Sequence, residues 1–516
     1  MNSDQSIKSL AIVGGGTAGW MAACMLANRF AHLSISLIES HEIGTIGVGE
    51  ATVPYIKEFL QELKIDEVDF IRHTHATYKL GIAFDGWYKP GHSFLHPFAG
   101  YGSRIARIPF HHFWTKLKQQ GKAQELDAYC LSSQMARHNR FALPKPNSDV
   151  ELSSFNYAFH FDAGLFASYL RGWAEKKGVI RKEAKVICVE QQTDTGLIER
   201  LQLSTGESIE ADFFIDASGF KGLLIEETLH TGYEDWSHWL PCDRAIALPC
   251  RSQQPPAGFT RSLATAAGWQ WRIPLQHRVG NGHVYCSRFM SDDQALTLLQ
   301  EQLQGEPLAE PKLIPFTTGM RKRAWYKNVF CVGLASGFLE PLESTSIYMV
   351  QSSLDIFIQH FPRRAGDTGL AQRVNQQLRL RQEKLRDFLI LHYWANQRIG
   401  EPFWDECRQM AIPESLRERI ACFRDTGRIN QDELDFFRTN SWLAMFAGFD
   451  INSHYYHPAV DEFDEAQLEQ ELARIAQSIQ QTVTRLPSHE EFIRRNCVMV
   501  NNQPLAEDSG ALFSLA

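Results

Sequence analysis

The first forty residues show apolar runs and small residues in the order strand, glycine turn, helix, strand. Leu10 to Val13 form an apolar run, and Gly14 to Gly19 follow with the pattern G-x-G-x-x-G. Trp20 to Ala27 has helical composition, and Ser34 to Glu39 predicts a second strand that ends in an acid. This order is typical of a dinucleotide-binding βαβ unit and is far more specific than the glycine pattern alone.

Each position of this turn suits a cofactor contact. Gly14 permits a tight turn, Gly16 lets the backbone approach a pyrophosphate, and Gly19 lets the helix pack closely on the sheet. Glu39 can accept hydrogen bonds from ribose hydroxyls. Thr17 and Ala18 lie between the glycines and belong to the same expected contact. A glycine-rich turn without a ligand is the alternative interpretation.

Two later apolar runs also end in small residues. They are Phe213 to Gly219 and Val329 to Gly337, and each predicts a buried strand whose carboxyl end delivers backbone to a ligand. Three such strand ends over more than 300 residues favour a cofactor longer than a single nucleotide, so FAD fits better than NAD. The expected contacts here are Asp216, Gly333 and Phe338.

The remaining pattern predicts strands first and helices afterwards. Residues 185–190 and 198–203 indicate a hairpin, and residues 268–288 more strand. After about Ser352 helices dominate, with segments expected at 378–391, 413–423 and 431–437 and an apolar stripe from Leu468 to Leu486. We therefore expect an α/β fold. Residues 1–360 would form a Rossmann-like FAD-binding domain with inserted β-sheet elements and a substrate-contacting insertion at about 76–115. Residues 361–516 would form a mainly helical domain that closes the substrate site.

Composition narrows the function further. The 516 residues carry a net charge of −8, which argues against a body built to bind nucleic acid phosphates. The ten cysteines are scattered, with no C-x-x-C pair and no His/Cys cluster at zinc spacing, so no metal site is expected. No apolar stretch is long enough for a transmembrane helix and no signal peptide is apparent, so a cytoplasmic location is expected.

Four segments together predict a more specific function than flavin binding alone. They are Gly14 to Trp20, Gly47 to Pro54 (GVGEATVP), Trp269 to Pro274 (WQWRIP) and Phe338 to Thr345 (FLEPLEST). In this order the chain resembles the flavin-dependent tryptophan halogenases from about residue 8 to about 365. The resemblance implies halogenation of an electron-rich, indole-type aromatic ring by hypohalous acid, which is made from oxygen and chloride or bromide at FAD. The reduced FAD would come from a separate flavin reductase. Gly49 and Ala51 would join the cofactor contacts, and the formation of a homodimer stays open.

Lys79 lies in the apolar stretch from Ala76 to Phe84. By itself this pattern favours a lysine whose ammonium reaches the surface. The resemblance places the catalytic lysine of the family at Lys79. A buried ammonium there can donate a hydrogen bond to hypohalous acid and raise its electrophilicity.

The segment Glu343 to Ser346 combines two expected functions. Glu343 matches the family's active-site glutamate, which would orient the halogenating species or take the proton lost from the ring. It is also an acid before an expected helix, a position that is stabilising without any catalysis. By the resemblance, backbone amides of Thr345 and Ser346 hold the halide. The family usually has glycine at the position of Ser346, and if this glycine needs a positive φ, Ser346 would strain the loop and favour bromide.

The substrate residues are also given by the resemblance. His96 and Phe98 match the two rings that sandwich the indole, although a loop histidine and a core phenylalanine explain them equally. The family holds the amino acid end of tryptophan with paired tyrosines, where this chain has Trp442 and Leu443. Trp269 and Trp271 lie on one face of a strand and are interpreted as core residues with a possible screening role at the flavin.

Two other functions stay open from the sequence. A single-component FAD-dependent aromatic monooxygenase needs the same glycine turn and strand ends but has no need of Lys79 or Glu343. A flavin-binding protein without catalytic activity would need only the fold and the cofactor site. The arene and the ring position are not predicted.

Overall fold

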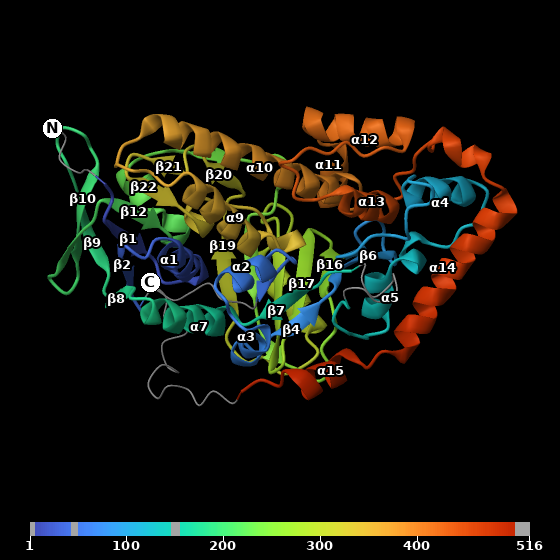
Figure 1. Cartoon of the computed structure of the whole chain (residues 1–516), viewed down its shortest axis with the longest axis horizontal. Helices are drawn as coiled ribbons and strands as arrows, with labels where there is room; N and C mark the ends of the chain where they lie inside the picture. Colours follow the sequence, from blue (N-terminus) through green and yellow to red (C-terminus); the bar gives the residue numbers. More distant parts are fainter. Residues whose placement is uncertain (1–5, 43–49, 146–154, 501–516) are drawn as a thin grey trace.

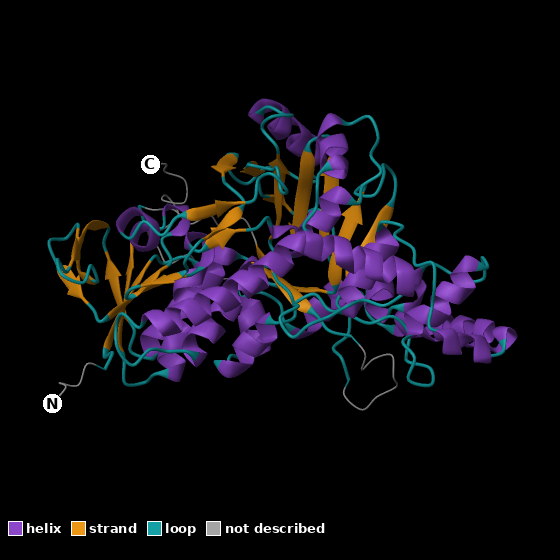
Figure 2. Cartoon of the chain, turned by 90° about the horizontal axis from the view of Figure 1, so that it is seen from above, coloured by secondary structure: helices purple, strands orange, loops and turns teal. Residues whose placement is uncertain are grey.

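The computed structural model describes residues 6–42, 50–145 and 155–500 of the chain. The molecule is elongated, with a parallel sheet and its helices at one end and a group of helices around α14 at the other (Figure 1). A second large sheet lies between them, and Figure 2 shows its strands rising on one side of a layer of helices. The strands of the two sheets come from the first two thirds of the chain, between Ser9 and Cys331.

The first sheet has six strands in the order β21-β22-β12-β1-β2-β8. All neighbours are parallel except β21 and β22. This arrangement, with α1, α7 and α9 packed on it, is the doubly wound fold expected from the first forty residues. The strands are Ser9–Val13 (β1), Ser34–Glu39 (β2), Ile180–Glu183 (β8), Phe213–Asp216 (β12), Trp325–Tyr326 (β21) and Val329–Cys331 (β22).

The three predicted strand ends meet at one edge of this sheet. Gly14 donates its backbone N–H to Ile38 O at 2.8 Å, and Ala217 donates to Val13 O at 2.8 Å. Val332 donates to Asp216 O at 2.9 Å. The segments after β1, β12 and β22 are therefore adjacent, as the carboxyl ends of parallel strands must be.

The second sheet has eight strands in the order β19-β14-β18-β17-β16-β5-β6, with β15 paired to β18. Strand β17 is the W-x-W-x-I-P segment, and its neighbours on both sides are antiparallel. The strands are Gly81–Asp85 (β5), Ser93–Pro97 (β6), Arg244–Ala247 (β14), Cys250–Arg251 (β15), Thr260–Thr265 (β16), Gly268–Pro274 (β17), Arg278–Tyr285 (β18) and Lys312–Pro315 (β19).

Three small sheets complete the strands. One joins Glu50–Ala51 (β3), Ala158–Phe161 (β7) and Thr77–Lys79 (β4). Another is the predicted hairpin Val186–Gln191 (β9) and Ile198–Leu203 (β10), extended by Ser208–Glu210 (β11). The third joins Tyr233–Asp235 (β13), Gly319–Arg321 (β20) and Gly337–Phe338 (β23).

Helices make up the regular structure of the described chain after β23, in agreement with the sequence pattern. The apolar stripe forms α14, and Ser488 caps the next helix by accepting the backbone N–H of Glu491 at 3.1 Å. The helices up to β23 are Thr17–Arg29 (α1), Ile56–Glu62 (α2), Glu67–His73 (α3), Phe110–Gln119 (α4), Leu131–Arg137 (α5), Ala163–Lys176 (α7) and Asp292–Gln302 (α8). Those after it are Ser346–Gln359 (α9), Thr368–Trp394 (α10), Pro402–Gln409 (α11), Glu414–Thr426 (α12), Thr439–Gly448 (α13), Glu465–Arg485 (α14) and His489–Asn496 (α15).

The helix predicted at 431–437 is wrong, because this segment is a loop. Phe436 stacks on Tyr348 with ring centroids 3.8 Å apart, while Phe437 stacks on Phe388 at 3.7 Å. Two consecutive side chains that both point inward suit an irregular segment better than a helix, in which neighbouring positions diverge. The division of the chain at residue 360 stays a prediction.

Gly14 gives a direct test of the glycine turn. Its φ is 115°, and a Cβ at this position would lie 2.2 Å from Ala217 O. We predict that Gly14→Ala lowers the free energy of unfolding by about 3 kcal/mol or more and abolishes FAD binding, because strain and overlap force the turn apart. Thermal unfolding and flavin titration measure both effects. Gly172→Ala, on α7 with no atom within 4 Å of the added Cβ, is the control and should keep FAD affinity.

Candidate active site

Lys79 is completely buried at the end of β4, so the prediction of a lysine that reaches the surface does not apply. Its Nζ donates to Thr52 O at 3.0 Å and to Ser344 Oγ at 2.7 Å. Burial lowers the pKa of Lys79 to about 7, and the negative charge of Glu343 opposes this shift. At neutral pH the group can therefore exist as an ammonium or as an amine.

The two acceptors of Lys79 come from different parts of the chain. Thr52 belongs to the G-x-G-E-A-T-V-P segment and is fixed on β7, where its backbone N–H and its hydroxyl both donate to Phe159 O. Ser344 follows the predicted catalytic glutamate. The ammonium also lies 5.3 Å from the ring centroid of Phe98, so the cation contacts one of the two side-chain rings that are expected to hold the substrate.

Glu343 ends a short 3₁₀ turn, Pro341–Glu343, and is also buried. His96 Nδ1 lies 2.8 Å from its Oε2, and His392 Nε2 lies 2.7 Å from its Oε1. Desolvation raises the pKa of this carboxyl, but the two histidines outweigh desolvation and lower it to about 2. Glu343 is therefore a carboxylate throughout the physiological pH range.

His392 was not predicted, and its contacts define its charge. Its Nδ1 lies 2.8 Å from Phe388 O, and a carbonyl oxygen can only accept. Its Nε2 contacts the Glu343 carboxylate, which also accepts. Both contacts are hydrogen bonds only when each ring nitrogen of His392 carries a proton. The position of His392 near the end of α10 offers no sequence signal.

Ser344 adopts an unusual backbone conformation that separates the two halves of the site. Its φ of 59° and ψ of 35° lie in the left-handed region, which a non-glycine residue adopts only at some cost. The reversal lets consecutive side chains serve different partners, with Glu343 bound to the histidines and Ser344 bound to Lys79. Strain of this kind is common where a site requires a fixed geometry.

Aromatic side chains surround His96. The rings of Phe388 and Phe437 lie 5.8 and 5.9 Å from it, and Trp442 meets Phe388 edge-on at 4.8 Å. Phe98 reaches the same region through its contact with Lys79. The structure therefore brings His96 and Phe98 together with Lys79 and Glu343, and adds Phe388 and Phe437. The two added residues are apolar positions that the sequence does not distinguish from core.

The expected halide segment begins α9. Ser346 is the first residue of this helix and Thr345 precedes it, so the first amides of α9 have no partner within the helix. Thr345 Oγ1 is buried and also lacks a hydrogen-bond partner. The expectation of strain at Ser346 is wrong, because the positive φ belongs to Ser344 and Ser346 is helical. Strain at Ser346 therefore gives no reason to expect a preference for bromide.

The structure describes all of the predicted cofactor residues except Gly49. Gly333 has a φ of 64°, and a Cβ there would lie 2.7 Å from Ala18 Cβ, so the end of β22 packs directly on the start of α1. Such close backbone approach at a helix N-terminus fits a bound pyrophosphate. Thr17, Gly16 and Gly19 lie in the same turn, Ala51 lies on β3, and Gly49 lies outside the described residues.

Two acids of the cofactor prediction already have partners within the chain. Glu39 contacts Arg181 and accepts from Trp20 Nε1 at 3.2 Å. Asp216 accepts from the backbone N–H groups of Leu224 and Ile225 at 2.8 Å, and its other oxygen accepts from Ser218. The Asp216 carboxylate therefore holds its own loop together. The ring of Phe338 lies between Phe220 and Phe316.

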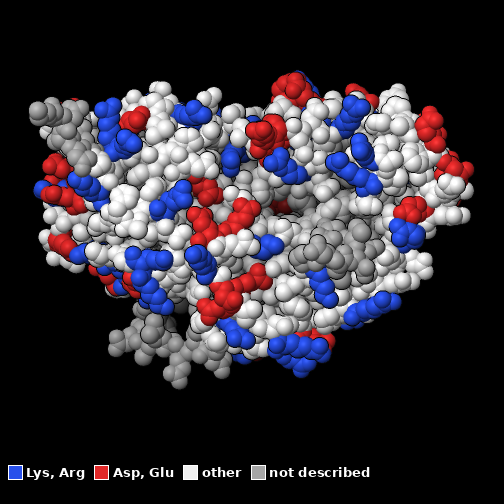
Figure 3. Space-filling model, in the orientation of Figure 1, with Lys and Arg blue, Asp and Glu red and all other residues white. Residues whose placement is uncertain are grey.

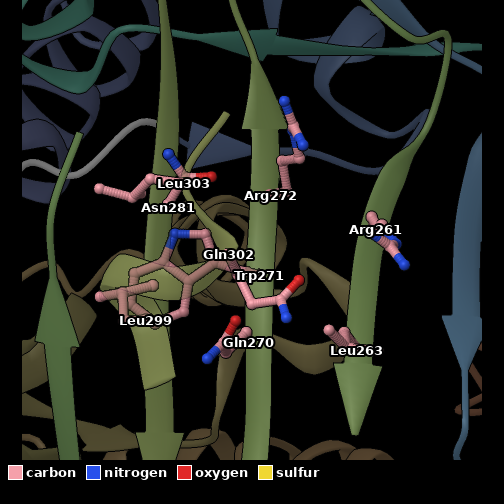
Figure 4. Close-up of a pocket in the computed structure, with 9 residues that line it drawn as sticks. All are labelled: Arg261, Leu263, Gln270, Trp271, Arg272, Asn281, Leu299, Gln302 and Leu303. Carbon is pink, nitrogen blue, oxygen red and sulfur yellow. The ribbon is translucent and has the colours of Figure 1, made fainter. Parts of the chain in front are cut away.

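The W-x-W segment is core, as expected. Trp269 and Trp271 are both buried, with ring centroids 6.2 Å apart. Figure 4 shows a small pocket on strands β16 to β18 that includes Trp271. Neither Lys79 nor Glu343 is among the residues that line it, so this pocket is separate from the site above. The lining residues are Arg261, Leu263, Gln270, Trp271, Arg272, Asn281, Leu299, Gln302 and Leu303.

Charged side chains of both signs lie on the face of the molecule seen in Figure 3. Figure 3 shows lysines and arginines interspersed with acids around a central hollow, without a continuous basic area for a polynucleotide. In the described ranges, no three His, Cys, Asp or Glu side chains are grouped so that they could hold a metal ion. No helix among the described residues combines the length and the apolar character needed to cross a membrane.

Comparison with known proteins identifies the family. Residues 9–465 match the family model described as tryptophan halogenase. The chain belongs to the tryptophan halogenase family. Family membership supports FAD-dependent halogenation of tryptophan or another aromatic compound over the two alternatives, an aromatic monooxygenase and a non-catalytic flavoprotein. The family uses FAD with oxygen and a halide.

Several halogenases cover nearly the whole chain. It is 34% identical over 473 residues to the tryptophan 7-halogenase RebH of Lentzea aerocolonigenes, covering 87% of this chain and 88% of RebH. The structure of BrvH, a flavin-dependent halogenase from Brevundimonas sp. BAL3, is 44% identical with a TM-score of 0.92, covering 95% and 99% of the two chains. A flavin-dependent halogenase from Xanthomonas campestris is 43% identical with a TM-score of 0.92, covering 96% and 99%. These matches confirm the predicted fold class.

Lys79 gives the first test of this halogenase's site. We predict that Lys79→Ala stops formation of halogenated product while reduced FAD is still oxidised by oxygen, because the lysine contacts the site around Glu343 rather than the sheet edge. In the unaltered enzyme, product formed per reduced FAD should fall as pH rises through about 7, since the ammonium is lost above its pKa. Product is measured by chromatography and flavin by absorbance. Lys116→Ala, which removes another buried lysine on α4, is the control. Halogenation by the Lys79→Ala enzyme would contradict the role.

Ser346 gives a second test. We predict that Ser346→Gly leaves the ratio of brominated to chlorinated product unchanged, because Ser346 is helical and glycine relieves no strain there. The cost should stay at about 1 kcal/mol or less of stability, the usual penalty of glycine in a helix. Ser344→Gly is the contrast, since it removes both the strained φ and the hydroxyl that binds Lys79. A halide ratio that moves with Ser346→Gly would restore the loop-strain argument.

Proposed function

We propose that this enzyme halogenates indole, or an indole-bearing molecule other than free tryptophan, with reduced FAD supplied by a separate flavin reductase. The contact that carries the proposal is the buried Lys79 ammonium, which lies between Thr52 O and Ser344 Oγ and beside the ring of Phe98. Such a cation suits an oxidant that must be held in a dry cavity next to an arene.

FAD fits the sheet edge at Gly14, Ala217 and Gly333, where backbone from three strands meets the N-terminus of α1. When bound and reduced, FAD supplies two electrons to oxygen and the halide supplies two more, which yields hypohalous acid and water. The protein contributes the positions of the reactants and the exclusion of solvent. The first amides of α9 and Thr345 Oγ1 would hold the halide as hydrogen-bond donors.

Lys79 would act on the oxygen of hypohalous acid. Its ammonium donates a hydrogen bond there and later gives the proton with which hydroxide leaves as water. The bond between oxygen and halogen breaks while the bond between halogen and ring carbon forms. Because the pKa of Lys79 is about 7, the proton can be given and regained at neutral pH.

Glu343 would stabilise the ring after halogen transfer. The halogenated ring carries a positive charge, and a carboxylate beside it lowers the energy of that cation. A carboxylate with a pKa of about 2 is a weak base. The cationic ring is a far stronger acid than an ordinary arene, so Glu343 can still accept its proton.

The substrate preference rests on α13. Trp442 and Leu443 are both almost completely buried, and the guanidinium of Arg419 lies 4.4 Å from the Trp442 ring on the side that α12 covers. Tyr455, a tyrosine shortly after α13, is 65% exposed. An ammonium placed against Trp442 and Leu443 would meet no hydrogen-bond acceptor on either side chain and would lose its hydration, at a cost of several kcal/mol.

The test is a competition assay. We predict that indole is halogenated faster than free tryptophan at equal concentration, because the aromatic side chains around His96 remain while Trp442 and Leu443 offer the ammonium of tryptophan no hydrogen-bond acceptor. The reaction needs a flavin reductase, oxygen and bromide or chloride, and products are read by mass spectrometry. Indole-3-propionate is a useful control, since it keeps the acid but lacks the amine. Tryptophan that reacts much faster than indole would contradict the proposal.

A further inference from the structure

Glu340 is a second buried carboxyl of the turn that carries Glu343. It is fully buried and immediately precedes the 3₁₀ turn Pro341–Glu343. Its Oε2 accepts from Trp269 Nε1 at 2.9 Å and from the Tyr393 hydroxyl at 2.5 Å. Its Oε1 has no hydrogen-bond partner and is shielded from solvent.

This pattern of contacts favours the neutral carboxyl. An ionised carboxylate would leave Oε1 with uncompensated negative charge in a dry environment, which is costly. In the neutral form, the proton sits on Oε1, because Oε2 already accepts two hydrogen bonds. The geometry alone therefore separates Glu340 from Glu343, whose two oxygens both have donors.

The partners of Glu340 join three elements of the active site. Trp269 belongs to β17, and Tyr393 is the neighbour of His392 on α10. Glu340 therefore connects the W-x-W strand and the helix of His392 to the turn that presents Glu343 and Ser344. An error in the orientation of this turn would displace both the carboxylate and the acceptor of Lys79.

We propose that Glu340, in its protonated form, is a positioning residue of the halogenation site, which fixes the Glu343–Ser344 turn on β17 and α10. The proposal rests on the halogenase function above. It also gives Trp269 a role that does not require contact with the flavin, as the indole donor that holds Glu340.

The groups that face Glu340 supply no positive charge. Tyr393 of α10, Cys242 before β14 and Cys407 of α11 are its titratable neighbours, and burial raises the pKa of each. All three are therefore neutral around pH 7. Burial raises the pKa of Glu340 itself to about 7, while the hydrogen bonds from Trp269 and Tyr393 oppose this shift.

The sign of the pH dependence follows from this raised pKa. In the unfolded chain Glu340 ionises near its ordinary pKa of about 4.3. Between that value and about 7 the folded protein holds a proton that the unfolded chain has lost. The contribution of neutral Glu340 to the free energy of unfolding is therefore largest below about pH 4.3. It is lost as the pH rises through about 7.

The experiment compares Glu340→Gln, which stays neutral, with the unaltered enzyme. The difference in melting temperature between the unaltered protein and Glu340→Gln should fall as pH rises from 5 to 8, without any substrate present. With indole, halide and a flavin reductase, product per reduced FAD should fall less steeply above pH 7 in Glu340→Gln, because only the Lys79 ionisation remains. Glu340→Leu should lower the product formed per reduced FAD by on the order of tenfold or more, with FAD affinity unchanged.

Two further observations keep the test decisive if Glu340→Leu does not fold. Tyr393→Phe removes a hydrogen bond that lowers the pKa of Glu340. The fall in product per reduced FAD at alkaline pH should therefore occur at a higher pH in this variant than in the unaltered enzyme. Trp269→Phe should do the same. Identical pH profiles for the unaltered enzyme, Glu340→Gln and Tyr393→Phe would overturn the proposal. Absence of any halogenated indole from the unaltered enzyme would instead refute the substrate proposal, since the melting comparison needs no turnover.

Discussion

The burial of one ammonium governs the arrangement of this active site. Lys79 has no solvent contact, and its two hydrogen bonds reach a backbone carbonyl at Thr52 and a hydroxyl at Ser344. A buried cation without such acceptors would lose its proton or destabilise the fold. The acceptors come from segments that are far apart in the sequence. The lysine therefore holds both sides of the site together while it keeps a pKa suited to proton transfer.

The turn from Glu340 to Ser344 shows how environment divides tasks between similar groups. Glu340 and Glu343 are three residues apart and both are buried, yet burial raises the pKa of Glu340 to about 7 and histidines lower that of Glu343 to about 2. The difference arises from the donors: an indole and a phenol for Glu340, two imidazoles for Glu343. The hydrogen bonds from the indole and the phenol do not outweigh the effect of burial on the pKa of Glu340, whereas the two histidines outweigh it at Glu343. Opposite protonation states of this kind are a mark of acid–base sites.

Family membership and the local geometry support different parts of the functional conclusion. The match over residues 9–465 gives the reaction class, since it includes both the cofactor segments and the Glu343 turn. The proposed substrate preference rests on α13, where Trp442 and Leu443 are buried. A shared reaction with a changed substrate pocket is expected when catalytic residues lie on sheets and turns and the pocket is closed by a separate set of helices.

The sequence by itself determined the βαβ unit, because the positions of Gly14, Gly16, Gly19 and Glu39 obey local backbone rules. It also indicated the strand ends at Asp216 and Gly333, and family resemblance identified Lys79, Glu343, His96 and Phe98. Only the tertiary structure decided that His392, 49 residues after Glu343, contacts it, that Phe437 lies in a loop rather than a helix, and that the strained φ belongs to Ser344 and not to Ser346. These features depend on contacts between distant segments. Local periodicity carries no information about which buried side chains will meet, or about the proton affinity that each gains from its neighbours.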